Sequence, residues 1–120
     1  MKRRACVVAL LAAGSGVTAR GEPSAGERSR IEGLIAAVGR RSDIRFLRNG
    51  KEYDGAQAAD FLRGKFLWQI EQIATVQDFI ERVGTRSTTS GDVYKVRLAD
   101  GRIVASADFL TQELRRLDRR

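Results

Sequence analysis

Apolar side chains recur along residues 56–83 at the spacing of one face of an α-helix. The positions are separated by three or four residues, and they are Leu62, Phe66, Ile70, Ile73, Val76, Ile80 and Val83. This repeat places them on a single stripe, which is stable only when it is buried against other elements. Phe61, Trp68 and Phe79 widen the stripe. We therefore expect residues 56–83 to be the core around which the other elements pack, with Trp68 at its edge. The alternative for Trp68 is that it stacks on a ligand or anchors a partner.

Two capping signals divide this central segment. Asp54 and Gln57 are three residues apart, and so are Thr75 and Asp78. At this spacing each side chain can bond the other residue's backbone N–H at a helix start. The sequence thus predicts a helix that begins after Asp54, a break or kink near Thr75, and a second helix beyond it. Gly64 lies inside the first helix, where we expect another element to approach the backbone closely.

A second amphipathic pattern runs over residues 27–39, before the central segment. Its apolar positions follow the i, i+3, i+4, i+7 order, and they are Ile31, Leu34, Ile35 and Val38. Ser24, or a residue near it, is placed to cap the start of this helix, and Gly39 is placed to end it. We expect the helix to rely on packing against the central segment.

The pair Asn49-Gly50 predicts a β-hairpin between these two helical regions. Both central positions of a type I′ turn have a positive φ, which Asn and Gly tolerate best. The short segments on either side are residues 45–48, with Phe46 and Leu47 apolar, and residues 51–53, in which we expect Tyr53 to pack back on the sheet. They are the predicted strands of the first hairpin.

The pair Asp100-Gly101 predicts a second hairpin. Residues 93–98 alternate with period two before the turn, and residues 102–105 form the returning strand. Ser106 is placed to cap a last helix. The apolar positions of that helix are Phe109, Leu110, Leu114 and Leu117.

The predicted order of elements is helix, β-hairpin, long or kinked helix, β-hairpin and C-terminal helix. Because the strands are confined to hairpins and no βαβ crossover pattern is visible, the fold class is α+β with a small antiparallel sheet. A lone hairpin is marginally stable in water. We therefore expect the two hairpins to join in one sheet.

The first nineteen residues have the three parts of a secretory signal peptide. A basic start is followed by an apolar run over residues 5–13 and then by small residues. An uncleaved membrane anchor is the alternative, but it needs roughly 18 to 20 apolar residues. We expect cleavage near Ala19, a flexible tether over residues 20–26 and a single domain over residues 27–120. The mature protein would then be periplasmic, without a membrane span.

Composition excludes several kinds of site. The chain has no His, and its one Cys, Cys6, lies in the predicted leader. The usual general base and zinc sites built from Cys and His are therefore excluded from the mature protein, and no metal or cofactor is predicted. The formal net charge is +7. The excess is scattered rather than gathered on one face, so nucleic acid is not an expected partner.

Four stretches of the chain carry a family resemblance. They are RFLRNGKEY from Arg45, AADFLRGKF from Ala58, ATVQDFIERVGTRSTTSGDVYKV from Ala74, and FLTQEL from Phe109. Across about residues 30–117 the chain resembles the YfeK-like group of small exported bacterial proteins, a domain of unknown function. The resemblance implies a periplasmic protein, and it implies no reaction, cofactor or catalytic residue. Phe61 departs from the pattern, in which a polar residue, often His, is expected.

The hydroxyl-rich loop, residues 85–92, is the most promising candidate site. Its hydroxyls and amides can bind an anion, with Arg86 supplying charge. The alternative is that the hydroxyls bond their own backbone. We predict that Arg48 and Arg86 converge with Tyr53 or Tyr94 on one surface. The candidate ligand-binding residues are Arg48, Tyr53, Arg86, Ser87, Ser90 and Tyr94.

The leading hypothesis is a non-enzymatic periplasmic domain that binds an envelope protein or a small anion at this surface. The alternative is an envelope hydrolase that uses paired carboxylates, such as Asp78 and Glu81, or a Ser–Lys pair. A nucleophilic Ser needs a base. Because the chain has no His, the base would have to be Lys65 or Lys95, and only if folding brings one of them to the loop. A third reading is a structural envelope protein without a dedicated pocket.

Overall fold

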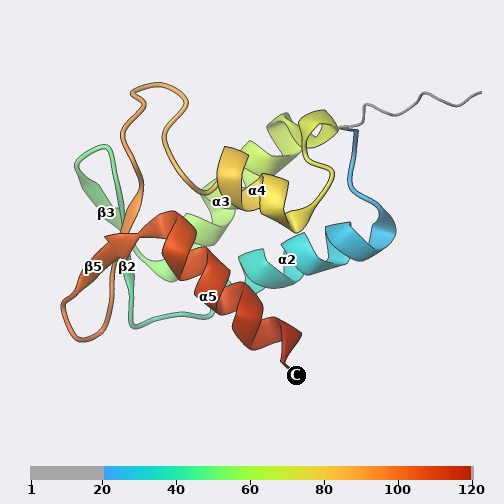
Figure 1. Ribbon diagram of the computed structural model, residues 1–120. Coiled ribbons are helices and arrows are strands. Elements are labelled where there is room, and N and C mark those ends of the chain that lie inside the picture. The colour runs from blue at the N-terminus through green and yellow to red at the C-terminus, as the bar shows by residue number, and fades with distance from the viewer. Residues whose placement is uncertain (1–20, 120) are drawn as a thin grey trace, which may run out of the picture.

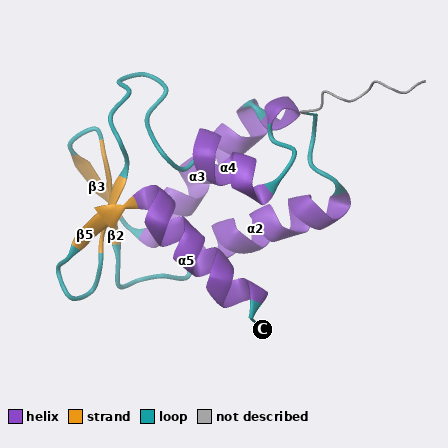
Figure 2. Cartoon of the chain, in the orientation of Figure 1, coloured by secondary structure: helices purple, strands orange, loops and turns teal. Residues whose placement is uncertain are grey.

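The computed structural model describes residues 21–119, so the predicted signal peptide and its cleavage site near Ala19 lie outside the described residues. The chain forms an α+β fold with the predicted order of elements (Figures 1 and 2). The elements are α2 (Ala25–Gly39), β2 (Arg45–Arg48), β3 (Lys51–Tyr53), α3 (Gly55–Trp68), the 3₁₀ turn η2 (Ile70–Gln72), α4 (Val76–Arg82), β4 (Lys95–Arg97), β5 (Ile103–Ala105) and α5 (Ser106–Asp118).

Side-chain caps start α3 and α4 where the sequence predicts them. The Asp54 carboxylate accepts the Gln57 backbone N–H at 2.8 Å, and the Gln57 side chain accepts the Asp54 N–H at 3.0 Å. Thr75 and Asp78 form the second reciprocal box, at 3.0 and 3.3 Å. Each box satisfies backbone donors that have no partner inside the helix. The predicted break near Thr75 is therefore confirmed.

Two boundary predictions need correction. The first half of the central segment was expected to remain helical to about Ile73, but α3 ends at Trp68 and a 3₁₀ turn follows it. Ser106 does not cap α5, because the cap position is Ala105 and Ser106 is the first helical residue. The Ser106 hydroxyl is buried and has no partner among the described residues. By contrast, Ser24 caps α2 as predicted and accepts the Glu27 N–H at 3.2 Å.

The two hairpins join in one antiparallel sheet of order β3-β2-β4-β5, as predicted. Asn49 and Gly50 have φ values of 50° and 80°, the left-handed conformation that the turn requires. In the register, Phe46 lies opposite Tyr53 on one neighbouring strand and opposite Val96 on the other. These side chains share one face, since successive residues of a strand alternate. The helices gather on one side of the sheet (Figure 2).

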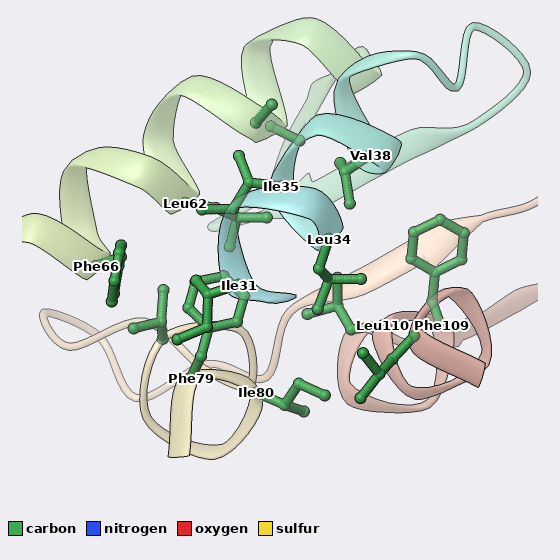
Figure 3. Packing of buried hydrophobic residues seen from close by; sticks show 14 of the residues in the cluster. Ile31, Leu34, Ile35, Val38, Leu62, Phe66, Phe79, Ile80, Phe109 and Leu110 are labelled. Atoms are coloured by element: carbon green, nitrogen blue, oxygen red, sulfur yellow. The ribbon is translucent and has the colours of Figure 1, made fainter. Parts of the chain in front are cut away.

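The core is centred on α2, which packs against α3, α4 and α5 (Figure 3). The predicted α2 face is fully buried, at Ile31, Leu34, Ile35 and Val38. The central stripe is buried as well, except that Ile70 is half-buried. The expectation of one central rod is therefore only partly right: the rod is broken into α3 and α4, and α2 lies against both. Among residues 21–119, no helix combines the length and apolar character needed to cross a membrane.

Candidate functional site

Helix α3, strand β2 and the hydroxyl-rich loop border a half-open pocket of about 370 Å³, which we call the Arg48 pocket. Its lining residues are Arg48, Phe61, Gly64, Lys65, Trp68, Ser87, Thr88, Thr89 and Tyr94. Three of the six predicted site residues, namely Arg48, Ser87 and Tyr94, therefore line one cavity. Folding thus brings the first hairpin and the loop together.

Helix α3 contributes one continuous face to the pocket. Phe61, Gly64, Lys65 and Trp68 are offset by three, four and seven residues. Side chains with these offsets lie on the same side of a helix, over a length of about 10 Å. This face differs from the apolar stripe that carries Leu62 and buries it in the core. The helix therefore separates a core face from a pocket face.

Arg48 is held in the pocket by aromatic rings and not by a carboxylate. Its guanidinium carbon lies 4.7 Å from the ring centroid of Phe61 and 5.8 Å from that of Tyr53. The guanidinium makes no hydrogen bond or ion pair within residues 21–119, and its Nε atom is buried without a partner. Cation–π contacts orient an arginine and leave its N–H donors unused. Arg48 thus presents unused donors at the pocket.

Phe61, where the family pattern leads us to expect a polar residue, has a clear role here. Its ring makes edge contacts with Phe46, Tyr53 and Tyr94, at centroid distances of 5.1 to 5.9 Å. The ring is therefore fixed on several sides. The Arg48 guanidinium packs over this fixed ring.

Lys65 is the second cation of the pocket. Its Nζ atom donates to the carbonyl oxygens of Arg86 at 2.7 Å and Val83 at 3.2 Å, and it lies 3.2 Å from the Tyr94 hydroxyl. These acceptors are neutral, so they fix the position of the ammonium without cancelling its charge. Lys65 also joins α3 to the start of the hydroxyl-rich loop.

The hydroxyl-rich loop is ordered largely by its own side chains. Ser87 Oγ accepts the backbone N–H groups of Thr89 and Ser90, both at 3.2 Å, and Ser87 is buried. The Ser90 hydroxyl donates to Asn49 Oδ1 at 2.7 Å, which clips the loop to the hairpin turn. Ser87 therefore follows the alternative in which hydroxyls bond their own backbone.

The remaining predicted site residues act from outside the cavity. Tyr53 lies behind Arg48, and Ser90 holds the loop against the turn. Arg86 pairs through its backbone with Val93, and its side chain is exposed and does not line the pocket. The Arg86 side chain therefore does not join Arg48 in this pocket. The Arg86 carbonyl, rather than its charge, contributes by holding Lys65.

Two residues named in the hydrolase alternative, Lys65 and Asp78, make structural contacts in the described part of the chain. Folding does bring Lys65 to the loop, but no hydrogen bond between described residues joins it to Ser87. An activated serine needs its base within hydrogen-bond reach. Asp78 accepts two backbone N–H groups at the start of α4, which accounts for that carboxylate as a cap. Residues 21–119 contain no cluster of acidic, His or Cys side chains able to hold a metal ion.

A second and larger cavity, of about 520 Å³, lies between the β4–β5 hairpin and α5, and we call it the Arg41 cleft. The Arg41 guanidinium donates to Glu113 at 2.5 Å and makes two bonds to Asp43, at 2.8 and 3.0 Å. The bonds from Arg41 lower the pKa of Asp43, and Asp43 in turn raises the pKa of Arg41. Both signs of charge line this cleft, and they pair with each other.

The residues that α3 contributes to the pocket are absent from the predicted ligand-binding set. Trp68 was expected at the edge of the core, but its side chain is 81% exposed, so that prediction is wrong. Gly64 was expected to face a close neighbour, yet a Cβ atom there would meet nothing within 4 Å. Lys65 was considered only as a possible base. The signal that could have found them is their shared helical face with Phe61, distinct from the apolar stripe.

Comparison with known proteins places the chain in a family. YfeK of Salmonella typhimurium, a protein described as uncharacterised, is 33% identical over 95 residues, which cover 78% of this chain and 77% of the relative. No solved structure gives a significant match. A model of a family of unknown function, DUF5329, matches residues 25–118 and hence every helix and strand of the fold. The chain belongs to the DUF5329 family.

Proposed function

We propose that this protein is a periplasmic binding domain and that the Arg48 pocket receives a small anionic ligand. One observation carries the proposal. Arg48 and Lys65 both line the pocket, and none of the described residues that line it is acidic. Two cations without a carboxylate form a site that an anion stabilises.

The charge pattern elsewhere in the described chain makes this pocket distinctive. Of the thirteen other described arginines, seven have a carboxylate within 4 Å, and they are Arg28, Arg30, Arg41, Arg63, Arg97, Arg102 and Arg116. The other six are exposed to solvent. Arg48 has none, although it is half-buried. A ligand oxygen that reaches its guanidinium would supply the missing acceptor. Charge-assisted hydrogen bonds of this kind contribute about 1.5–3 kcal/mol.

The two cations are also held in place before any ligand arrives. Arg48 lies over two aromatic rings, and the Lys65 ammonium has three neutral neighbours within 3.2 Å. A side chain already held in one position loses little conformational entropy on binding. The pocket can therefore bind a small ligand without rearranging its walls.

The sole tryptophan of the chain makes this proposal easy to test. Trp68 lines the pocket, so its fluorescence reports on binding there. We expect inorganic phosphate to change the fluorescence of the purified protein in a saturable way. Arg48→Gln should weaken binding about tenfold or more, because it removes a charged donor worth at least 1.4 kcal/mol.

Arg45→Gln is the matched control for that experiment. Arg45 lies three residues earlier on the same strand, is exposed, and does not line the pocket. Its guanidinium donates to the neighbouring Ile44 carbonyl at 2.8 Å. We expect this variant to bind phosphate like the wild type. An unsaturable wild-type response, or equal weakening by the two substitutions, would refute the proposed site.

The periplasmic part of the proposal is supported by the leader-like composition of the first nineteen residues. Expression of the full chain in a bacterium should give periplasmic protein that starts at residue 20. A chain that lacks residues 1–19 should remain in the cytoplasm. Full-length protein that stays in the cytoplasm with Met1 intact would contradict this location.

A further inference from the structure

Trp68 stands at the Arg48 pocket with most of its indole uncovered. Its side chain is 81% exposed, although tryptophan buries more apolar surface than any other residue when it packs. Lys65 precedes Trp68 by three residues, so the two side chains lie on the same face of α3. An exposed, flat indole beside fixed cations is suited to hold the apolar face of a ligand.

Gly64 leaves the helix surface bare between Phe61 and Trp68. A Cβ atom at Gly64 would have no neighbour within 4 Å, so packing gives no reason for glycine here. At Gly55 and Gly84, by contrast, the nearest atom would lie only 2.3 Å from a Cβ. Glycine weakens a helix interior relative to alanine. Gly64 therefore lowers the stability of α3, and the missing side chain leaves open space on the pocket side of the helix.

The loop side of the pocket carries hydroxyl groups. Thr88 and Thr89 of the loop line it, together with Tyr94. The cavity of about 370 Å³ is at the small end of the range for ligand pockets, about 300–1,000 Å³. One wall is thus apolar and flat, and the other is rich in hydroxyls. A ring with an apolar face and hydroxyl groups on its edge matches both walls.

We infer that the ligand of the Arg48 pocket is an anionic sugar, which deepens the proposed function and rests on it. The sugar ring lies across Gly64 and against Trp68. Its hydroxyls bond the wall formed by the loop, and its carboxylate or phosphate group binds Arg48 beside Lys65. An aromatic acid would use the indole and the cations but would leave the hydroxyl wall without partners.

Five probes separate this inference from simple anion binding. They are glucuronate, glucose 6-phosphate, inorganic phosphate, glucose and benzoate, each titrated against Trp68 fluorescence. We expect the two anionic sugars to bind about tenfold or more tighter than phosphate, and glucose to bind weakly. Phosphate or benzoate binding as tightly as the sugars would overturn the inference and leave the proposed function standing. If no anion binds, both fail.

Gly64→Ala and Gly33→Ala form a matched pair of variants. Gly33 lies in α2, away from the pocket, and it also has open space where a Cβ would stand. Each substitution should raise Tm by a few degrees, about 2–6 °C, because alanine favours the helix. Only Gly64→Ala fills the pocket floor. We expect it to weaken anionic-sugar binding at least fivefold while phosphate binding stays unchanged.

The contrary results for this pair are equally clear. Sugar binding by Gly64→Ala equal to that of Gly33→Ala would exclude a ring seated over Gly64. Equal loss of sugar and phosphate binding in Gly64→Ala would show that the methyl group disturbs the cations, and the ring assignment would fall. A raised Tm in the same sample confirms that the variant is folded.

Discussion

Among the described arginines that lie over aromatic rings, Arg41 and Arg48 differ in what else they bind. In the Arg41 cleft, the Arg41 guanidinium lies 5.4 Å from the centroid of Phe109 and also bonds Asp43 and Glu113. In the Arg48 pocket, Arg48 lies 4.7 Å from the centroid of Phe61 and has no carboxylate partner among the described residues. Both guanidinium groups therefore pack over an aromatic ring, but only that of Arg41 is also paired with carboxylates.

This difference shows why cavity size is a poor guide to the site. The Arg41 cleft is the larger cavity, but its charges are committed to holding the fold together. Glu113 lies 72 residues from Arg41, so their bond ties the end of α2 to α5. In the smaller Arg48 pocket, Arg48 has an N–H donor without a partner, and the charge of Lys65 is not neutralised by a carboxylate. The proposed function therefore assigns binding to the unpaired charge rather than to the larger volume.

The largest effect that tests this comparison is expected from Arg41→Ala. The substitution leaves the Glu113 side chain, which is 5% exposed, with only Arg116 at 3.6 Å. Removing one partner of a largely buried pair should lower the free energy of unfolding by about 2–3 kcal/mol. Urea denaturation measures this loss. Phosphate binding, followed by Trp68 fluorescence, should not change.

Arg116→Ala is the control for that variant. Arg116 is 59% exposed and contacts the same carboxylate from solvent, so its loss should change stability by less than about 0.5 kcal/mol. Equal effects of Arg41→Ala and Arg116→Ala would show that the cleft is not a structural clamp. Loss of phosphate binding in Arg41→Ala would move the anion site to the cleft.

The local parts of the fold were predictable because their chemistry is complete within a few residues. A capping box needs only two side chains three positions apart, as at Asp54 and Gln57. A type I′ turn needs two residues that tolerate positive φ, as at Asn49 and Gly50. Helix periods likewise identify which face is buried. The family resemblance, too, was correctly recognised from short motifs.

Trp68 was misplaced for a geometric reason. It lies two residues after Phe66, which is about 200° around the helix, so the two side chains cannot share one stripe. Its large apolar surface outweighed this angle in the sequence interpretation. The 3₁₀ turn that follows Trp68 then redirects the chain and leaves the indole uncovered.

The candidate site was only half predictable because its two walls are far apart in sequence. Turn and hydroxyl signals identified Arg48 and Ser87, but the position of Lys65 depends on tertiary packing. Lys65 reaches the Arg86 carbonyl across 21 residues. The bond between Arg41 and Glu113 has no local signal either. Such contacts follow from how the elements pack, which periodicity alone does not determine.

Two buried serines, Ser87 in the hydroxyl-rich loop and Ser106 in α5, differ in whether the hydroxyl has a partner. Ser87→Ala removes the acceptor of two backbone N–H groups, and we expect a loss of about 1–2 kcal/mol. Ser106→Ala, at the start of α5, should be neutral or stabilising, because its hydroxyl is buried without a described partner. Urea denaturation measures both variants. The pair therefore compares a hydroxyl that supports the structure with one that does not.

Hydrogen exchange sharpens the serine experiment. In Ser87→Ala the amides of Thr89 and Ser90 should exchange faster, since they lose their acceptor. A loosened loop should also weaken phosphate binding about threefold, a smaller effect than that of Arg48→Gln. Unchanged exchange at both amides, or equal stability losses in the two serine variants, would mean that the loop is held by other contacts.

The smallest expected effect is the acid sensitivity that the Arg41 cleft confers. Hydrogen bonds from Arg41 lower the pKa of Asp43 below its ordinary value, with Arg116 adding a weaker attraction. The carboxylate therefore stabilises the folded state fully above about pH 4–5, and this contribution is lost as the pH falls through the lowered pKa. Because Asp43 is 47% exposed, we expect only about 0.2–1 kcal/mol.

Asp43→Asn isolates that contribution. The variant should show a shallower fall in the free energy of unfolding between about pH 5 and pH 3, measured by urea denaturation at each pH. In an Arg41→Ala background the same substitution should change the slope much less, because only the weaker attraction of Arg116 remains. If Asp43→Asn has the same effect in both backgrounds, Arg41 is not the cause of the acid sensitivity. The ion pair between Arg41 and Asp43 would then not stabilise the fold. The contrast between the paired charges of the cleft and the unpaired cations of the Arg48 pocket would be lost.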